Sequence, residues 1–105
     1  MLALKMTITR YVSDDPQPGI VECVMVDARG RRWMFLEKTA VVSAENLNSL
    51  TQCPRPVAIA VEELDRFQDS QLGELVRVGT DRPWGIQSVE GETQFEVFPA
   101  SLVEM

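Results

Sequence analysis

The side chains that could do chemistry in this chain are carboxylates, arginines and two cysteines, because the sequence contains no histidine. Ser-His-Asp and Cys-His catalysis both need an imidazole that titrates near neutral pH. Most catalytic zinc sites need histidine or a cluster of cysteines. The sequence therefore predicts a protein that is not an enzyme of these classes, with no catalytic residue, no metal site and no cofactor.

The two cysteines are predicted to be structural. Cys23 lies in an apolar run beside Val21 and Met25, which predicts a small buried side chain. Cys53 precedes a proline in an expected loop, and a reactive thiol there would need a cation, for which only Arg55 is close in sequence. Without a CxxC pair or an export signal, both thiols are expected to be reduced.

Acidic residues are densest at Glu62, Glu63 and Asp65. Neighbouring residues of a strand point to opposite faces, so these carboxylates should not converge on one site. Asp27 and the pair at residues 14–15 lack the spacing of a calcium-binding loop. We expect solvated charges, although a carboxylate-dependent enzyme or ligand-binding barrel stays open if two acids meet in one cavity.

Trp84 is the strongest candidate for a binding residue. It lies in Asp81-Arg82-Pro83-Trp84-Gly85, where the proline and the closing glycine favour a type I turn. A turn that also carries Asp81 and Arg82 should face solvent, and exposed tryptophan is enriched in interface hot spots. The competing interpretation is that the indole folds back and closes one end of a small barrel.

A second candidate binding group is the set Arg29, Arg31 and Arg32, next to Trp33 at a predicted hairpin tip. Gly30 lies within this tip and can take the positive φ that a tight hairpin turn needs. Arginine pairs with carboxylates or phosphates through two hydrogen bonds and stacks on tryptophan. The alternative is that these charges only protect a sheet edge from pairing with other chains.

The 105 residues have a net charge of −6, and the excess of acidic residues lies in the second half of the chain. This balance argues against nucleic acid and anionic membranes as partners. It is consistent either with a soluble surface or with an acidic face that docks a basic protein. The first ten residues lack the apolar run of a signal peptide, so we expect a cytoplasmic location.

Strand signals dominate the chain, which we interpret as a single domain over residues 1–105. Alternating or β-branched runs are separated by Gly- and Pro-containing turns. The expected strands are residues 2–9, Ile20–Ala28, Arg32–Lys38, Val57–Phe67, Glu74–Thr80, Ile86–Val89 and Thr93–Phe98.

Three details of this interpretation are specific enough to test. Apolar residues on both faces of Arg32–Lys38 suggest a strand near the middle of a barrel or sandwich. Residues 57–67 fit a strand or a helix, and we favour a strand because residues 69–73 look like a hairpin loop. Residues 40–42 can extend the preceding strand, and Ser43 can cap one or two helical turns.

The ending FPASLVE, residues 98–104, resembles the last strand of SH3 domains, where a Phe-Pro-containing 3₁₀ turn precedes the final strand. The resemblance covers only these residues and implies no binding residues. Together with the strand signals it leads us to expect an all-β fold, a small partly open barrel of six or seven short strands, SH3-like by preference, with at most one short helix.

A broader resemblance covers VECVMVDARGRRWMFLEKTAVVSAENL and GELVRVGTDRPWGIQSVEGETQFEV. These segments look like small bacterial β-proteins of no assigned function, which implies a bacterial cytoplasmic setting and no activity. We predict a non-enzymatic protein-interaction or binding module, monomeric or homodimeric. The alternatives are an immunity-protein or antitoxin-like inhibitor of a basic toxin, and the enzyme or ligand-binding barrel mentioned above.

Overall fold

The structure, a computed structural model, describes residues 1–13, 15, 19–42 and 52–104, which form eight strands, one short α-helix and one 3₁₀ turn. In chain order these are β1 (Leu2–Ser13), β2 (Ile20–Val26), β3 (Arg32–Lys38), α1 (Thr39–Val42), β4 (Arg55–Ala60), β5 (Glu62–Asp69), β6 (Gly73–Gly79), β7 (Gln94–Val97), η1 (Pro99–Ser101) and β8 (Leu102–Glu104). No helix among these residues is long and apolar enough to cross a membrane.

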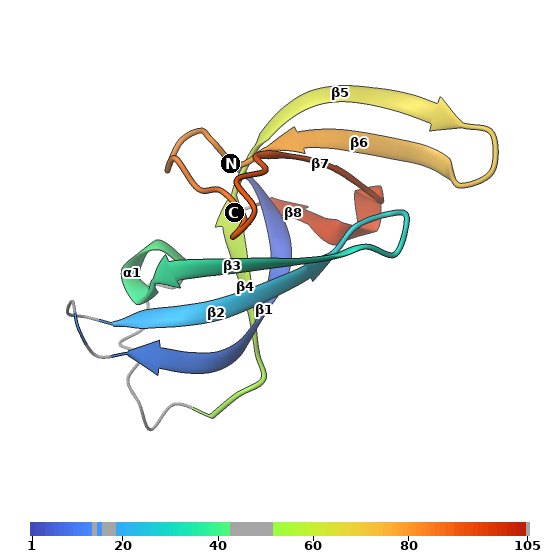
Figure 1. The fold of residues 1–105 in the computed structure, drawn as a ribbon. Coiled ribbons are helices and arrows are strands. Elements are labelled where there is room, and N and C mark those ends of the chain that lie inside the picture. Colours follow the sequence, from blue (N-terminus) through green and yellow to red (C-terminus); the bar gives the residue numbers. More distant parts are fainter. Residues whose placement is uncertain (14, 16–18, 43–51, 105) are drawn as a thin grey trace.

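The strands form two antiparallel sheets (Figure 1). The first has the order β3-β2-β1-β4, and β8 pairs with the start of β1. The second has the order β5-β6-β7. The predicted all-β class is therefore confirmed.

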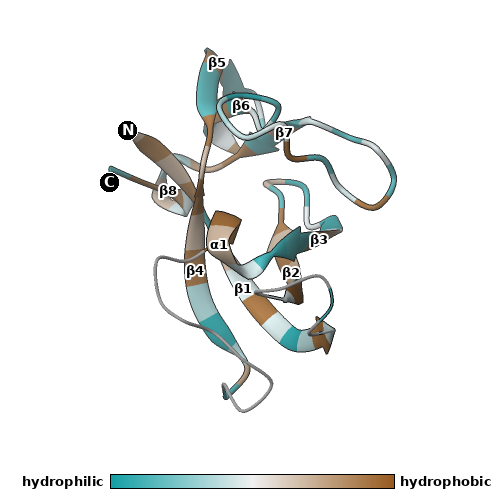
Figure 2. Ribbon diagram, turned by 90° about the vertical axis from the view of Figure 1, so that its left-hand side faces the viewer, coloured by the Kyte–Doolittle hydropathy of each residue, from teal (hydrophilic) through white to brown (hydrophobic). Residues whose placement is uncertain are grey.

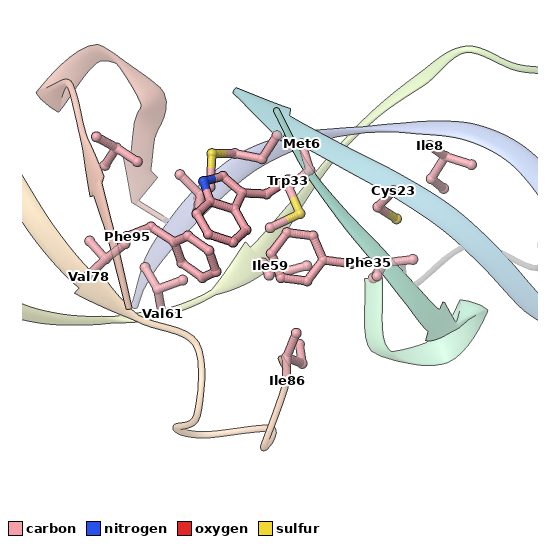
Figure 3. Packing of buried hydrophobic residues seen from close by; sticks show 14 of the residues in the cluster. Met6, Ile8, Cys23, Trp33, Phe35, Ile59, Val61, Val78, Ile86 and Phe95 are labelled. Carbon is pink, nitrogen blue, oxygen red and sulfur yellow. The ribbon is translucent and has the colours of Figure 1, made fainter. Parts of the chain in front are cut away.

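One apolar cluster joins the two sheets (Figure 3). Phe95 of β7 packs edge-on against Trp33 and Phe35 of β3, with ring centroids 5.1 and 5.6 Å apart. In the first part of β1, the alternate residues Leu4, Met6 and Ile8 are buried and face the same cluster. Period-two alternation places these side chains on one face of the strand, as the sequence predicts.

The strand count exceeds the expected six or seven because the segment Val57–Phe67 is divided. It is extended, as predicted, but β4 ends at Ala60 and β5 begins at Glu62. Between them Val61 is buried and donates its amide to the Leu2 carbonyl at 3.0 Å. The chain thus passes from one sheet to the other at this residue.

The hairpin of β5 and β6 has the predicted loop at residues 70–72 and is exposed along most of β5. Figure 2 shows the hydrophilic character of β5, in contrast to the apolar ribbon of α1. Charged residues on an edge strand oppose pairing with other chains.

Two local expectations were wrong. Ile86–Val89 forms no strand, because only Ser88 bonds across the turn, donating to the Glu92 carbonyl at 2.9 Å. Residues 40–42 belong to the short helix α1 and do not extend β3. The helical turns expected after Ser43, and part of the loop expected at residues 13–19, lie outside the described residues.

β3 lies at the edge of its sheet, and the expectation of a middle strand was wrong. Trp33 and Phe35 face the core, whereas Met34 and Leu36 on the other face are partly exposed. Only one face of β3 is therefore buried. The apolar side chains of the other face lie at the surface of an edge strand.

The end of the chain has the predicted local design. The 3₁₀ turn η1 follows Phe98, and β8 then pairs with β1 in antiparallel register, with Ala3 opposite Val103. The SH3-like topology itself stays a prediction.

Candidate functional site

The turn that carries Trp84 is fixed at its base by buried hydrogen bonds. The Thr80 hydroxyl donates to the Ile86 carbonyl at 2.7 Å, and the Ile86 amide donates to the Thr80 carbonyl at 3.1 Å. The Gly85 amide closes the turn on Asp81 at 2.7 Å, so the closing hydrogen bond spans five residues and not the four of a type I turn. Gly85 has a φ of +64°, a conformation that glycine adopts without steric cost.

This turn presents Trp84 to solvent with 61 % of the residue exposed. Asp81 and Arg82 are exposed beside it. The indole therefore does not close the end of a barrel. Trp33 supplies the buried tryptophan, and its indole nitrogen donates to the Asp27 carboxylate at 2.9 Å.

Asp27 organises the predicted hairpin tip. One of its carboxylate oxygens accepts the amides of Arg29 and Arg31, each at 2.9 Å. Gly30 has a φ of +83°, as the tight turn was expected to require. Asp27, which does not fit the spacing of a calcium-binding loop, thus holds the turn of the hairpin.

The arginines of the tip bind acids of the second sheet and of the turn before β7, and they do not form one site with the Trp84 turn. Arg29 bonds to Glu96 at 3.0 Å and to Asp69 at 3.2 Å. Arg31 pairs with Glu90 at 2.8 Å, and its guanidinium lies over the ring of Trp33, 3.8 Å from the centroid. Within the described residues, no hydrogen bond, ion pair or cation–π contact joins these arginines, or the exposed Arg32, to the Trp84 turn.

Glu96 is the centre of this contact and was not singled out in the sequence. Besides Arg29 it binds Arg77 at 3.0 Å, and Arg77 also lies 3.5 Å from Asp65. The hydrogen bond from Arg77, aided by Arg29, lowers the pKa of the Glu96 carboxyl. Backbone amides of the β5–β6 loop likewise lower the pKa of Asp69.

A cleft of about 320 Å³ lies beside this cluster, lined by Asp27, Arg77 and Phe95 among others. Its cations and carboxylates largely neutralise one another. A general acid needs a raised pKa, whereas that of Glu96 is lowered, so Glu96 is poorly suited to act as a general acid at neutral pH.

Ion pairing also accounts for most of the acids in the second half of the chain. Besides those named above, Glu63 and Glu74 both bind Arg66 at 2.9 Å, and Glu104 binds the N-terminal ammonium group at 2.7 Å. Most of these acids therefore have a cation beside them.

The cysteines and candidate metal ligands give no reactive cluster in the described residues. Cys23 is buried in the core, and burial, with Glu37 nearby, raises its pKa to about 12. Cys53 is half-buried and packs against the core. Within the described ranges no three Cys, Asp or Glu side chains lie close enough to hold a metal ion.

A groove that the sequence did not indicate lies between β3 and residues 85–89. Its volume is about 410 Å³, and Leu36, Glu37, Gly85, Gln87 and Val89 contribute to its lining. The Val89 amide donates to the Met34 carbonyl at 2.9 Å and closes one end. The alternation of apolar and polar residues at 86–89 could have suggested an extended segment, but not its position beside β3.

Glu37 is the unusual charge in this groove. It is half-buried, and no hydrogen bond or ion pair joins its carboxylate to another described residue. Burial raises its pKa, an effect that neighbouring Lys38 partly opposes. Leu36 and Val89 flank it with 47 % and 58 % of their surfaces exposed.

Comparison of the chain with protein-family models, curated proteins and solved structures finds no match. The candidate site is therefore defined by its geometry alone.

Proposed function

We propose that this chain is a small non-enzymatic binding module of the bacterial cytoplasm, and that the Trp84 turn holds a protein partner. The observation that carries the proposal is the exposure of 61 % of Trp84 on a turn fixed by buried hydrogen bonds. Because the turn is already ordered, little backbone freedom is lost when its side chain binds a partner. Such residues commonly supply the anchor of a protein interface.

Two further observations support binding over catalysis. Glu96, a carboxylate of the 320 Å³ cleft, is paired with Arg29 and Arg77, which lower its pKa. The exposed side chains beside Trp84 are one acid and one base, Asp81 and Arg82, which suit the polar rim of an interface. Arg29 and Arg31 are occupied in holding the hairpin tip to the second sheet, so we place the site at the Trp84 turn.

The test is a pull-down from native lysate of the source bacterium, with purified wild type, Trp84→Ala and Val26→Ala as baits. Val26 is a matched control because it is also an exposed apolar residue, 56 % exposed, but lies on β2. We expect Trp84→Ala alone to lose the partner. Since both sites are exposed, both variants should keep the stability of the wild type within about 0.5 kcal/mol.

Retention of the same proteins by all three baits would show that Trp84 is not part of the binding site. Loss of the proteins by both variants would point to a general effect of surface apolar area and would also count against a specific role for the turn.

A further inference from the structure

We propose that the groove between β3 and residues 85–89 accepts an extended segment of the partner protein, which adds to β3 as a strand and places a Lys or Arg side chain against Glu37. This inference rests on the proposed function, since it assumes a protein partner. It adds a second, chemically defined contact next to the Trp84 turn.

The backbone of β3 leaves hydrogen-bonding groups available on its outer edge. The Met34 carbonyl accepts from Val89 and so points away from β2. In an antiparallel ladder every second residue directs both backbone groups to the same side, so the amide and carbonyl of Leu36 also point outward. Neither group has a partner in the described part of the chain. Exposed edges of this kind accept extended peptides through main-chain hydrogen bonds.

The side chains of β3 specify what such a peptide would carry. A strand beside β3 alternates its side chains between the two faces of the sheet. Residues on the face of Met34 and Leu36 would meet apolar, partly exposed side chains. Residues on the other face would meet the carboxylate of Glu37. The groove therefore fits a segment in which apolar and basic residues alternate.

Charge complementarity favours a basic residue at the Glu37 position. The carboxylate has no cation bound to it within the described residues, and it is partly removed from water. Lys38 is the adjacent charge and lies on the opposite face of β3, while Asp81 and Arg82 near the Trp84 turn offset each other. The net charge of −6 adds a long-range attraction for a basic segment.

A partner segment fits the edge better than a second copy of this chain. Val89 already occupies the Met34 carbonyl, and α1 begins at Thr39, so the free edge is limited to Leu36–Lys38. Stable dimers bury on the order of 1,200–2,000 Å², and a strand pair this short gives little area. A peptide can instead use both walls of the groove.

The experiment selects heptapeptides from a random displayed library on the purified full chain. We expect the selected peptides to alternate apolar residues with Lys or Arg. Binding of one selected synthetic peptide is then measured against wild type, Leu36→Pro, Leu36→Val and Glu37→Gln. Proline removes the outward amide of Leu36 and is tolerated on an edge strand whose N–H faces solvent, whereas Leu36→Val keeps the amide and is the matched control.

Leu36→Pro should weaken binding about two- to tenfold, the effect of one lost hydrogen bond. Glu37→Gln should weaken it about two- to fivefold, as expected for a partly exposed ion pair, and Leu36→Val should change it less than either. A peptide N-methylated at its central amides should lose a similar factor on the wild type. This last measurement decides the question even if Leu36→Pro fails to fold.

Failure to select any peptide, or equal binding of the N-methylated peptide, would overturn the groove as a strand-binding site. A dimer seen by light scattering that Leu36→Pro dissociates would make a second copy the occupant and would overturn the proposal too. If Trp84→Ala loses the lysate partner while Leu36→Pro keeps it, the proposed function stands and this inference fails. If selected peptides bind the groove while Trp84→Ala keeps every lysate partner, the groove is a peptide-binding site and the proposed role of Trp84 fails.

Discussion

The two tryptophans, Trp33 and Trp84, lie in opposite environments. Trp33 is buried, its indole N–H satisfied by Asp27 at 2.9 Å and its ring covered by Arg31. Trp84 is left in solvent on a turn that the protein holds in place with buried hydrogen bonds. Exposure of a large apolar side chain contributes little to folding, and the role proposed for Trp84 is contact with a partner protein.

Glu37 lies in a position that lowers the stability of the fold, because its carboxylate is half-buried. Below pH 4.5, the ordinary pKa of the group, Glu37 is protonated in both the folded and the unfolded state. As the pH rises through the raised folded-state pKa, the unfolded state ionises more readily, and the folded state loses stability. The ionised Glu37 therefore destabilises the fold at neutral pH.

We predict that Glu37→Gln stabilises the protein at pH 7 by on the order of 0.5 kcal/mol, because it removes a half-buried unpaired charge. The gain should disappear near pH 4, where the wild-type carboxyl is itself largely protonated. Urea unfolding at both pH values measures it, with the exposed Glu62→Gln as control. A gain that is equal at the two pH values would contradict the assignment to ionisation.

At the scale of elements, the tip of the β2–β3 hairpin fastens one sheet to the other. The Ala28 amide donates to the Glu96 carbonyl at 2.9 Å, and Arg29 reaches the Glu96 carboxylate beside it. Arg31 makes a comparable contact with Glu90 on the turn before β7. These contacts also cover the edge of β7, while the charged and projecting β5 forms the other edge of that sheet.

We predict that Glu96→Gln destabilises the protein by about 1 kcal/mol at pH 7, because two arginines lose a shared ionised acceptor. The Glu96 pKa is lowered on folding, so its contribution is present above pH 4.5 and is lost as the pH falls through the folded-state pKa. Urea midpoints of wild type and variant should therefore converge near pH 3. Glu62→Gln is again the control, and a deficit that persists at pH 3 would assign the effect to packing.

On the scale of the whole molecule, the apolar cluster between the sheets makes them one cooperative unit. Val76, Val78 and Phe95 from the second sheet belong to the same cluster as Trp33 and Phe35 from the first. A two-sheet core of this kind should unfold in a single transition.

Phe95→Leu should lower the free energy of unfolding by about 1–2 kcal/mol, since it removes two edge-to-face ring contacts and leaves space in the core. Phe98→Leu is the matched control, because Phe98 is 38 % exposed and should tolerate the same change. Far-UV circular dichroism and Trp33 fluorescence in Trp84→Phe backgrounds should give coincident urea transitions. Separate transitions would show that the sheets fold independently.

Local structure was predictable where neighbouring residues decide it. Alternation in β1, the Gly30 turn and the 3₁₀ turn before β8 depend on short stretches of sequence, and all three were predicted. The errors arose where contacts distant in sequence decided the outcome. Residues 86–89 have a strand-like pattern, but Val89 bonds to Met34 and draws this segment toward β3.

The all-β class, the lack of histidine and the turn around Trp84 follow from the amino-acid sequence, because composition, period-two patterning and turn chemistry are local properties. Three features follow only from the folded chain: Trp84 is exposed, Arg29 is bound to Glu96, 67 positions away, and β3 is an edge strand beside a groove. Each of these depends on how segments far apart in the chain approach one another. Sequence periodicity carries no information on that approach, because it fixes the face of a strand and not its neighbour.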